Sequence, residues 1–498
     1  MTRRSRCAGW ALALSLLSLP LQAGQYVTIL HFNDFHGHLL PDAPGKDGVS
    51  HGGLARMATM VAQTRQWNEA HNVPTLLLEA GDILQGTPLS ATFKGEPDFT
   101  CLNLMGVDAM TLGNHEFDFG LDNLLARVRQ ARFPVRSASV LRAATRELLT
   151  PDPVTYLDLN GVKTAIVPLT TPETMVESAA KNVAGLEFTD PVATVRKLLP
   201  AVLQRADFVV ALTHLGLEAD RRLAREVPQL DVIVGGHSHD ALAEPERVGR
   251  TLICQAGSYG QYLGQLDAYV EAGEIAKYRG FLRSVDDPVP PRADVAQVVQ
   301  HYAGQLEVEM ARVVGNTSVP LVGDRDVIRS QETNLGNLVA DAMRDYAKAD
   351  IALTNAGGIR AGIDAGPITV GEVLTVLPFD NELVTVDLTG DQVLQVLRRD
   401  AALPAKDGGF LQVSGVRFVA RGGEVADVKA GDQALRPEKL YRAVTLDFLL
   451  TGGNGYEAFT HGRNPKPLGV MLSRVFTDYL KAHGSVAPRV EGRITLEH

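Results

Sequence analysis

The chain has 498 residues, of which 45% are hydrophobic and 21% charged, and its formal net charge is −10. This length suits two domains, and the balance of apolar and charged residues is that of a globular chain and not of a disordered one. The acidic net charge argues against a nucleic-acid polymer as partner, because such a partner requires an extended basic face.

Residues 1–23 have the pattern of a secretory signal peptide. Three arginines precede a short apolar run at 10–21, and Leu21-Gln22-Ala23 provides a small-residue cleavage site. The apolar run is shorter than the roughly 20 residues that span a bilayer, so we expect a cleaved leader and no membrane span. We therefore expect the mature protein to be periplasmic or secreted.

Two cysteines, Cys101 and Cys254, follow this leader. In an exported protein such a pair can form a disulfide. The apolar stretch around Cys254 is equally compatible with a buried free thiol. The sequence leaves both possibilities open.

Residues 24–287 contain short apolar runs that repeatedly end in polar residues. These runs are 26–32, 75–78, 109–112, 208–212 and 232–234. Helical patterns such as 54–67 and 121–131 lie between several of them, and this alternation predicts an α/β domain with buried strands. Ligands of such folds bind at the carboxyl ends of the strands, so the polar residues there predict one shared site.

The polar residues that follow these strands include many metal-ligand types. They are Asp34, His36, Asp82, Asn114, His115, His214, His237 and His239. Carboxylate oxygen and imidazole nitrogen together suit Zn, Mn, Fe or Co better than Mg or Ca alone. Without His115 the donors still exceed the needs of one tetrahedral metal, and they fit two metals that share a carboxylate. Any one of these histidines alone would be interpreted as a loop or core residue, so the joint pattern carries the prediction.

A Pro-rich segment at 286–291 ends the first domain. After it, residues 293–314 have apolar side chains at helical spacing. We interpret residues 288–316 as a linker helix and hinge, which leaves 317–498 as a second domain.

Three stretches of the chain resemble the calcineurin-like metallophosphoesterases and, among them, the 5′-nucleotidase family. These are Leu30 to Gly37 (LHFNDFHG), Glu79 to Asp82 (EAGD) and Leu112 to Asp118 (LGNHEFD). The resemblance covers nearly the whole mature chain. It implies an α/β fold: a metallophosphoesterase-type layered β-sandwich flanked by helices, then a linker helix and a second α/β domain that binds the nucleotide substrate.

The resemblance also implies two divalent metal ions. It assigns the first metal to Asp34, His36, Asp82 and His239. It assigns the second to Asp82, which bridges, together with Asn114, His214 and His237. His239 stands where the family often has an amide side chain, so the identity of the metals stays open among Zn, Mn, Co and Fe.

A further pair, His115 and Asp118, matches the catalytic pair of the family. The resemblance implies attack by a metal-activated hydroxide, with charge building on the phosphoryl group and the leaving oxygen. A histidine that is not a ligand can stabilise that charge or protonate the leaving group, and a carboxylate partner keeps it charged and oriented. We expect Glu116 to be a structural partner without a catalytic role.

In the C-terminal half the resemblance implies a substrate-binding set. It consists of Arg325, Arg329, Asn355, Gly358, Arg360, Phe379, Asn381 and Tyr456. The arginines would contact the phosphates or ribose, Asn355 would shape that pocket, and Asn381 would bond the base edge. Phe379 and Tyr456 would sandwich the base, and stacking contributes about 1–3 kcal/mol per base. The alternatives are surface ion pairs for the arginines and core packing for the aromatics, but neighbouring turn residues and glycines lead us to expect neither ring to be fully buried.

The expected activity is hydrolysis of nucleoside 5′-phosphates to nucleoside and phosphate, with UDP-sugars and nucleoside di- and triphosphates as further candidate substrates. Two alternatives belong to related enzymes: a 2′,3′-cyclic phosphodiesterase/3′-nucleotidase and a thiosulfohydrolase. A third is a non-catalytic surface protein that binds metal and nucleotide. The complete His115–Asp118 pair favours turnover, and the two aromatics favour nucleotides.

Overall fold

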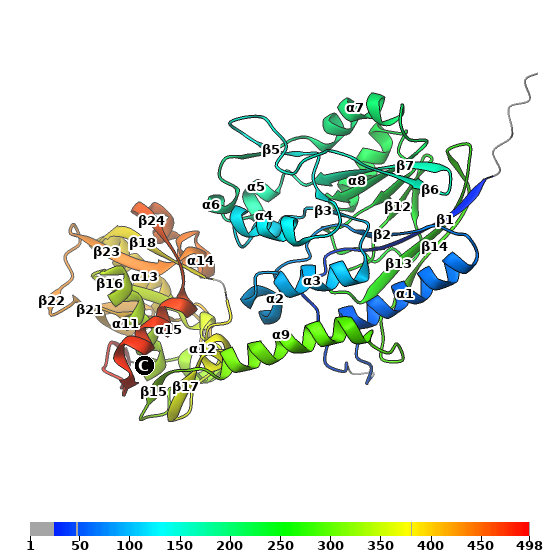
Figure 1. Cartoon of the computed structure of the whole chain (residues 1–498). Coiled ribbons are helices and arrows are strands. Elements are labelled where there is room, and N and C mark those ends of the chain that lie inside the picture. Colours follow the sequence, from blue (N-terminus) through cyan, green and yellow to red (C-terminus); the bar gives the residue numbers. More distant parts are fainter. Residues whose placement is uncertain (1–23, 46–47, 380, 498) are drawn as a thin grey trace, which may run out of the picture. The chain divides into compact units, whose positions relative to one another are not determined.

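The computed structural model describes residues 24–45, 48–379 and 381–497 (Figure 1). The signal peptide predicted for residues 1–23 lies outside this described part. The chain divides into two compact units, residues 1–304 and 305–498, and the division falls within helix α9 (Ala293–Ala311). Among the described residues, no helix is both long enough and apolar enough to cross a membrane.

Unit 1 contains two six-stranded sheets. The first, in spatial order, is β14 (Glu274–Ser284), β13 (Tyr262–Glu271), β1 (Gln25–Phe32), β2 (Thr75–Glu79), β3 (Ala109–Thr111) and β4 (Val135–Arg136). The second is β11 (Glu246–Val248), β12 (Thr251–Cys254), β10 (Val232–Val234), β9 (Phe208–His214), β7 (Val162–Thr170) and β6 (Thr155–Leu159). A short ladder pairs β5 (Val140–Arg142) with β8 (Leu186–Phe188).

The helices of unit 1 connect these strands. They are α1 (Leu54–Ala70), α2 (Pro88–Thr92), α3 (Glu96–Met105), α4 (Leu121–Gln130), α5 (Thr174–Glu177), α6 (Ala180–Val183), α7 (Pro191–Val202) and α8 (Leu217–Glu226), with a 3₁₀ turn at His115–Phe117. Their ends follow local rules: α7, for example, begins with Pro191 in its first turn, and the Asp190 carboxylate accepts a hydrogen bond from the Ala193 N–H at 2.8 Å.

The two sheets share one apolar layer. Ile29 and Leu78 of the first sheet belong to the same buried cluster as Ile166, Val210 and Val234 of the second. A separate cluster joins the second sheet to α7 and α8. Burying each such aliphatic side chain contributes about 1.5–3 kcal/mol, which explains why these strands are apolar along their whole length. The predicted layered β-sandwich flanked by helices is confirmed.

Strand direction decides where the functional side chains collect. Strands β1 to β4 run parallel to one another, as do β7, β9, β10 and β12. Their carboxyl ends therefore open into loops at one edge of each sheet. The antiparallel pair β13 and β14, joined by a tight turn, extends the first sheet beside β1.

Unit 2 is a second α/β unit. Its largest sheet has the order β19 (Leu411–Ser414), β16 (Ile351–Asn355), β23 (Leu440–Leu446), β18 (Glu382–Thr389) and β24 (Arg463–Met471). Two smaller sheets are β22 (Gln433–Ala434), β21 (Glu424–Ala430), β20 (Val416–Arg421), β26 (Ile494–Glu497), and β17 (Gly366–Thr369), β15 (Val313–Thr317), β25 (Ser485–Val486). The helices are α10 (Arg325–Ile328), α11 (Asn334–Ala347), α12 (Val370–Val376), α13 (Gly390–Ala401), α14 (Asp447–Leu450) and α15 (Leu472–His483), with 3₁₀ turns at Ala356–Gly358, Gly453–Gly455 and Glu457–His461.

Cys101 and Cys254 are both buried and free. Burial raises the pKa of each thiol to about 12, so both stay protonated at neutral pH. Of the two possibilities that the sequence left open, the structure has the buried free thiols.

Candidate functional site

The loops that follow β1 and β2 are tied together by their backbones. The N–H of Asp34 donates to the carbonyl of Gly81, and the N–H of His36 donates to the carbonyl of Asp82, both at 3.0 Å. A third loop, after β10, joins them because the His237 N–H lies 2.9 and 3.1 Å from the two carboxylate oxygens of Asp34. Strand ends from both sheets therefore meet at one place.

Backbone strain is concentrated at this meeting point. Several predicted ligands have left-handed φ values: Asp34 (49°), His36 (49°), Asp82 (59°), His237 (81°) and His239 (59°). Such a conformation costs a non-glycine residue about 1–3 kcal/mol and clusters at functional sites. The loops are also closely packed, since a Cβ atom at Gly113 would lie only 2.2 Å from Oδ1 of Asp82.

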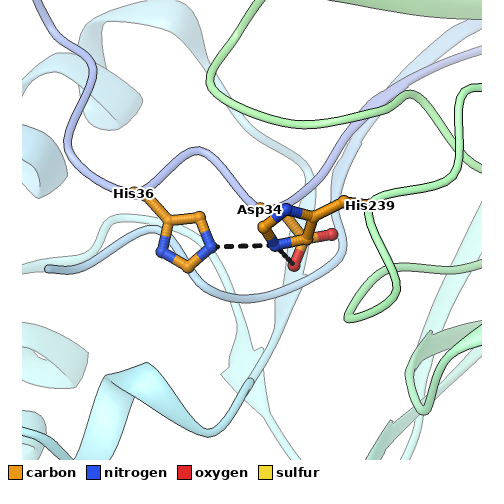
Figure 2. Close-up of side chains that lie close together, drawn as sticks. All are labelled: Asp34, His36 and His239. Carbon is orange, nitrogen blue, oxygen red and sulfur yellow. Dashed lines mark hydrogen bonds and ion pairs between the residues drawn. The ribbon is translucent and has the colours of Figure 1, made fainter. Parts of the chain in front are cut away.

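Asp34, His36 and His239 form the first donor group (Figure 2). Nε2 of His36 lies 3.2 Å from Nε2 of His239, which lies 3.4 Å from Oδ1 of Asp34. Figure 2 shows the two imidazoles approaching Asp34 from different loops. Burial lowers the pKa of His36 to about 4, against the opposing effect of Asp82, so its imidazole is neutral, as a metal ligand must be.

The second donor group consists of Asp82, Asn114, His214 and His237. Nε2 of His214 lies 3.1 Å from Oδ2 of Asp82 and 3.2 Å from Oδ1 of Asn114. Nδ1 of His237 lies 3.1 Å from the same Asn114 oxygen. Oδ2 of Asp82 is also 4.0 Å from Nε2 of His36, so this one carboxylate faces both groups.

The donor chemistry of both groups fits divalent metals. Each combines carboxylate oxygen with imidazole nitrogen, which are donors typical of Zn, Mn, Fe and Co. Within the sets Asp34, His36, His239 and Asp82, His214, His237, one ligand atom from each residue lies within 4.8 Å of the others. Burial alone would raise the pKa of Asp82, but His214, His115 and His36 together outweigh it and hold that pKa well below its usual range. The shared carboxylate is therefore charged.

His115 and Asp118 form a close pair beside these groups. Nδ1 of His115 lies 2.6 Å from Oδ2 of Asp118, and the His115 side chain remains 31% exposed. Burial disfavours the imidazolium, but the Asp118 hydrogen bond and the Asp82 charge outweigh it and raise the pKa of His115 to about 9. With Nδ1 directed at Asp118, the other ring nitrogen is free to donate a hydrogen bond.

Glu116, for which the sequence predicted only a structural role, joins two ligand-bearing loops. Its fully buried carboxylate accepts hydrogen bonds from the N–H groups of Asp82 (2.8 Å), Ile83 (2.9 Å) and Gly113 (2.6 Å), with Leu84 at 3.3 Å. This carboxylate therefore connects the loop of Asp82 to the loop that carries Asn114.

Several of the predicted substrate residues line one cavity of unit 2. Its volume is about 230 Å³, and its walls are Asn355, Gly357, Gly358, Phe379, Asn381, Gly408, Phe448 and Asn454. Phe379 is 47% exposed, so the expectation that its ring is not fully buried is confirmed. Nδ2 of Asn355 donates to Oδ1 of Asn454 at 3.2 Å, while the buried Oδ1 of Asn355 has no hydrogen-bond partner among the residues that the structure describes.

The three predicted arginines lie close enough to influence one another. Burial and the charges of Arg325 and Arg360 lower the pKa of Arg329. Arg329 also lies beside Gly408 of the cavity wall, and its buried Nε has no hydrogen-bond partner in the described part of the chain. The Arg360 guanidinium carbon is 5.8 Å from the centre of the Phe379 ring. This grouping of guanidinium charges is suited to an anion.

The expectation of an incompletely buried ring is wrong for Tyr456. That side chain is 1% exposed, and its hydroxyl donates to the Gly409 carbonyl (2.8 Å) and contacts Oδ1 of Asp400 (3.1 Å). Tyr456 belongs to the buried core cluster of unit 2, and it directly follows Gly455, whose φ of 76° is left-handed.

Phe448 is the aromatic residue that the sequence interpretation missed. It is 45% exposed and lines the same cavity as Phe379. A Cβ on Gly453 would lie 2.7 Å from the Phe448 ring, so this glycine makes room for it. The available signal was an aromatic residue placed shortly before the Gly452-Gly453 loop.

Comparisons with known proteins agree with this geometry. The calcineurin-like phosphoesterase family matches residues 27–241, and the 5′-nucleotidase C-terminal domain family matches residues 313–461. A 5′-nucleotidase from Vibrio cholerae is 32% identical over 508 residues, which cover 92% of this chain and 91% of that protein. The trifunctional nucleotide phosphoesterase protein YfkN from Bacillus subtilis is 35% identical over 524 residues, but this chain spans only 35% of its length.

A solved structure gives the same result. The 5′-nucleotidase precursor from Thermus thermophilus has a TM-score of 0.60 and 33% identity, covering 95% of this chain and 99% of that one. Calcineurin-like phosphoesterases use divalent metal ions, which agrees with the two donor groups. The chain therefore belongs to the 5′-nucleotidase family of calcineurin-like phosphoesterases, which are metal-dependent phosphoester hydrolases.

Proposed function

We propose that this protein is an exported hydrolase of nucleoside 5′-phosphates that uses two divalent metals. The observation that carries the proposal is the convergence of two donor groups that share Asp82, next to the His115–Asp118 pair. Residues 1–23 would direct export to the periplasm or beyond. Residues 24–287 would form the catalytic domain, 288–316 a linker and hinge, and 317–498 the nucleotide-binding domain.

The metals would be held by the residues of the two donor groups. Asp34, His36 and His239 would hold one cation, and Asn114, His214 and His237 the other, with Asp82 between them. When bound, Zn, Mn, Co or Fe at these donors would supply Lewis-acid activation of the phosphoryl group and of water. The neutral form of His36 and the charged form of Asp82 are the protonation states that this assignment requires. Against the effect of burial, Asp82 raises the pKa of His214 to about 10, so a cation bound there would displace a proton from this imidazole.

His115 would act on the substrate directly. Asp118 holds its Nδ1, so Nε2 is left to donate a proton or hydrogen bond to the phosphoryl oxygen or the leaving oxygen. The raised pKa of about 9 keeps this imidazole charged at neutral pH. Because the charge on those oxygens grows toward the transition state, the contact would stabilise the transition state more than the bound substrate.

Substrate choice would come from unit 2. Arg325, Arg329 and Arg360 would bind the phosphates or ribose through their guanidinium groups, and the buried Nε of Arg329 makes no hydrogen bond within the described residues. Asn355 and Gly358 would shape the pocket. Asn381 would meet the base edge.

Base stacking would use a different pair of rings from the one predicted. Phe379 and Phe448 are both about half exposed and line one cavity, whereas Tyr456 is buried. Stacking contributes about 1–3 kcal/mol per base and accepts any base, so a broad nucleotide preference follows.

The test is phosphate release by the purified mature chain loaded with Mn, Zn or Co. The substrates are AMP, UMP, ATP, UDP-glucose, 2′,3′-cyclic AMP and p-nitrophenyl phosphate. The Asp82→Ala variant should lose activity by about 10³-fold or more, equivalent to about 4 kcal/mol of barrier. Replacement of the exposed Asp364 by Ala is the matched control and should change nothing.

The pattern of outcomes separates the two halves of the proposal. Hydrolysis of nucleotides far above p-nitrophenyl phosphate supports both the metal site and base recognition. Equal turnover of every ester contradicts base recognition alone. An absence of turnover with every metal contradicts the hydrolase itself.

A further inference from the structure

The two ring nitrogens of His237 face different surroundings. Nδ1 lies 3.1 Å from Oδ1 of Asn114, inside the second donor group. Nε2 lies on the outer side, 3.4 Å from Oε2 of Glu173 and 3.8 Å from Oε1 of Glu177. A ring nitrogen can bind a cation only without its proton, so the proton of a neutral ligand must sit on the opposite nitrogen.

The two glutamates come from one short turn. Glu173 precedes α5 and Glu177 ends it, and this spacing of four residues places both carboxylates on one side of the turn. The Glu177 N–H donates to the Glu173 carbonyl at 3.0 Å, and the buried Thr174 hydroxyl donates to the Thr171 carbonyl at 2.8 Å. The turn is therefore internally fixed.

This turn is also attached to the ligand loop. The Ser178 hydroxyl, one residue after α5, donates to the backbone carbonyl of Asn114 at 3.1 Å. Asn114, which faces Nδ1 of His237, and Glu173 and Glu177, which face its Nε2, are therefore connected through the Ser178 hydrogen bond. A shift of α5 would move both sides of the imidazole together.

The proton of His214 is also positioned by an acceptor, but this acceptor is a backbone carbonyl and not a carboxylate. Its Nδ1 lies 2.8 Å from the backbone carbonyl of Ala80, which fixes the proton there and leaves Nε2 for the second donor group. Within the described part of the chain, Nε2 of His237 has no such carbonyl, and its polar contacts go to Glu173 and Glu177.

We propose that Glu173 and Glu177 are positioning residues for the second donor group. Glu173 accepts the hydrogen bond from Nε2 of His237, and the Glu177 carboxylate, 3.8 Å from the same nitrogen, adds negative charge there. Together they keep Nδ1 unprotonated toward Asn114, and the second donor group therefore binds a divalent cation more tightly. Partners of this kind orient a ligand and raise its basicity, and their loss costs about 10–100-fold in metal affinity. The inference rests on the proposed function, because it takes His237 as a ligand.

The experiment measures metal affinity independently of turnover. The Zn-loaded mature chain is titrated with a chromophoric chelator, which gives the stoichiometry and the dissociation constant of each site. We expect Glu173→Gln/Glu177→Gln to raise the Kd of one site about 10–100-fold and to leave the other site and the two-per-chain stoichiometry unchanged. Glu69→Gln, on an exposed side chain near the end of α1 and before the amino end of β2, is the matched control and should change neither Kd.

A double-mutant cycle tests whether the acids act through the histidine. With His237→Ala present, the two glutamine substitutions should have no further effect on Kd, because the ring they orient is gone. Glu173→Asp should restore part of the affinity. In the double glutamine variant, excess metal should return kcat toward that of the parent, since the acids do not touch the substrate. If the double variant does not fold, the single variants are compared in the same titration.

The other outcomes overturn the inference in distinguishable ways. Unchanged Kd values in the glutamine variants, with both sites lost in Asp82→Ala, contradict the positioning role and leave the proposed function intact. Loss of a whole metal equivalent in the double variant means that Glu173, Glu177 and His237 hold a cation themselves, which also contradicts it. Retention of both sites in Asp82→Ala contradicts the metal centre as a whole.

Discussion

Asp82 in unit 1 and Asp400 in unit 2 are both buried carboxylates, 2% and 3% exposed. Asp82 faces two histidines and keeps its charge, because their influence lowers its pKa. Asp400 contacts the Tyr456 hydroxyl and accepts a hydrogen bond from the Leu411 N–H, and burial raises its pKa to about 7. Burial of an acid therefore does not mark a functional site. The site in unit 1 is distinguished instead by several carboxylate and imidazole donor atoms that lie close together.

After the loss of a donor residue such as Asp82, the largest effect should come from the His115–Asp118 pair beside the two donor groups of unit 1. His115→Ala removes the charged donor, and we expect kcat to fall about 10²-fold or more with little change in KM, because the contact strengthens in the transition state. Steady-state kinetics with AMP measures this. Asp118→Asn should give a smaller fall in kcat. A rise in KM alone would mean that His115 binds the substrate without assisting the reaction.

The buried acid of unit 2 should control stability instead. The folded-state pKa of Asp400, about 7, exceeds its ordinary value of 3.8, so between those values the folded protein holds a proton that the unfolded chain has lost. Stability from this group is therefore highest below about pH 4 and falls as pH rises to 7, by at most about 1.4 kcal/mol per pH unit.

Asp400→Asn should remove that slope. Urea unfolding at about pH 4.5 and about pH 7.5 compares the variant with the parent chain, and the difference between the two proteins isolates this one group from the others that titrate. The same pH dependence in both proteins would mean that Asp400 stays charged in the fold.

The aromatic residues of unit 2 allow a smaller and more specific test. Phe448→Ala should raise KM for AMP about tenfold, since the loss of stacking costs about 1–3 kcal/mol. It should leave p-nitrophenyl phosphate hydrolysis unchanged. Phe379→Ala should behave alike. An unchanged KM in both variants would show that the cavity does not hold the base.

The smallest effect should come from Tyr456→Phe. It removes a hydroxyl with two buried partners, which should cost about 1 kcal/mol of stability, measured by urea unfolding. KM for AMP should stay the same. A KM change as large as that of Phe448→Ala would place Tyr456 in contact with the substrate after all.

The fold and the grouping of the donor side chains could be predicted from the sequence, because both depend on patterns along the chain. Apolar runs ending in Asp, His or Asn identify buried parallel strands and the loops at their ends. The left-handed backbones of Asp34 and His237 could not be predicted, since they are imposed by hydrogen bonds between loops far apart in the sequence.

The cavity of unit 2 was less predictable for a physical reason. Phe448 lies on α14, before the turn at Gly453–Gly455, and is 45% exposed, whereas Tyr456 follows that turn and is buried. Either ring would satisfy the same local pattern. The choice is made by partners such as Asp400, which lies 56 positions away in sequence.

The Glu116 carboxylate has a consequence for how this site can change. It accepts hydrogen bonds from the N–H groups of Asp82 and Gly113, which belong to two different loops, and so it fixes the distance between these loops. Shortening it by one methylene, as in Glu116→Asp, would withdraw the support of both loops together. Adaptation to a differently sized cation is therefore easier through the ligands at the rim, such as His239, than through this centre.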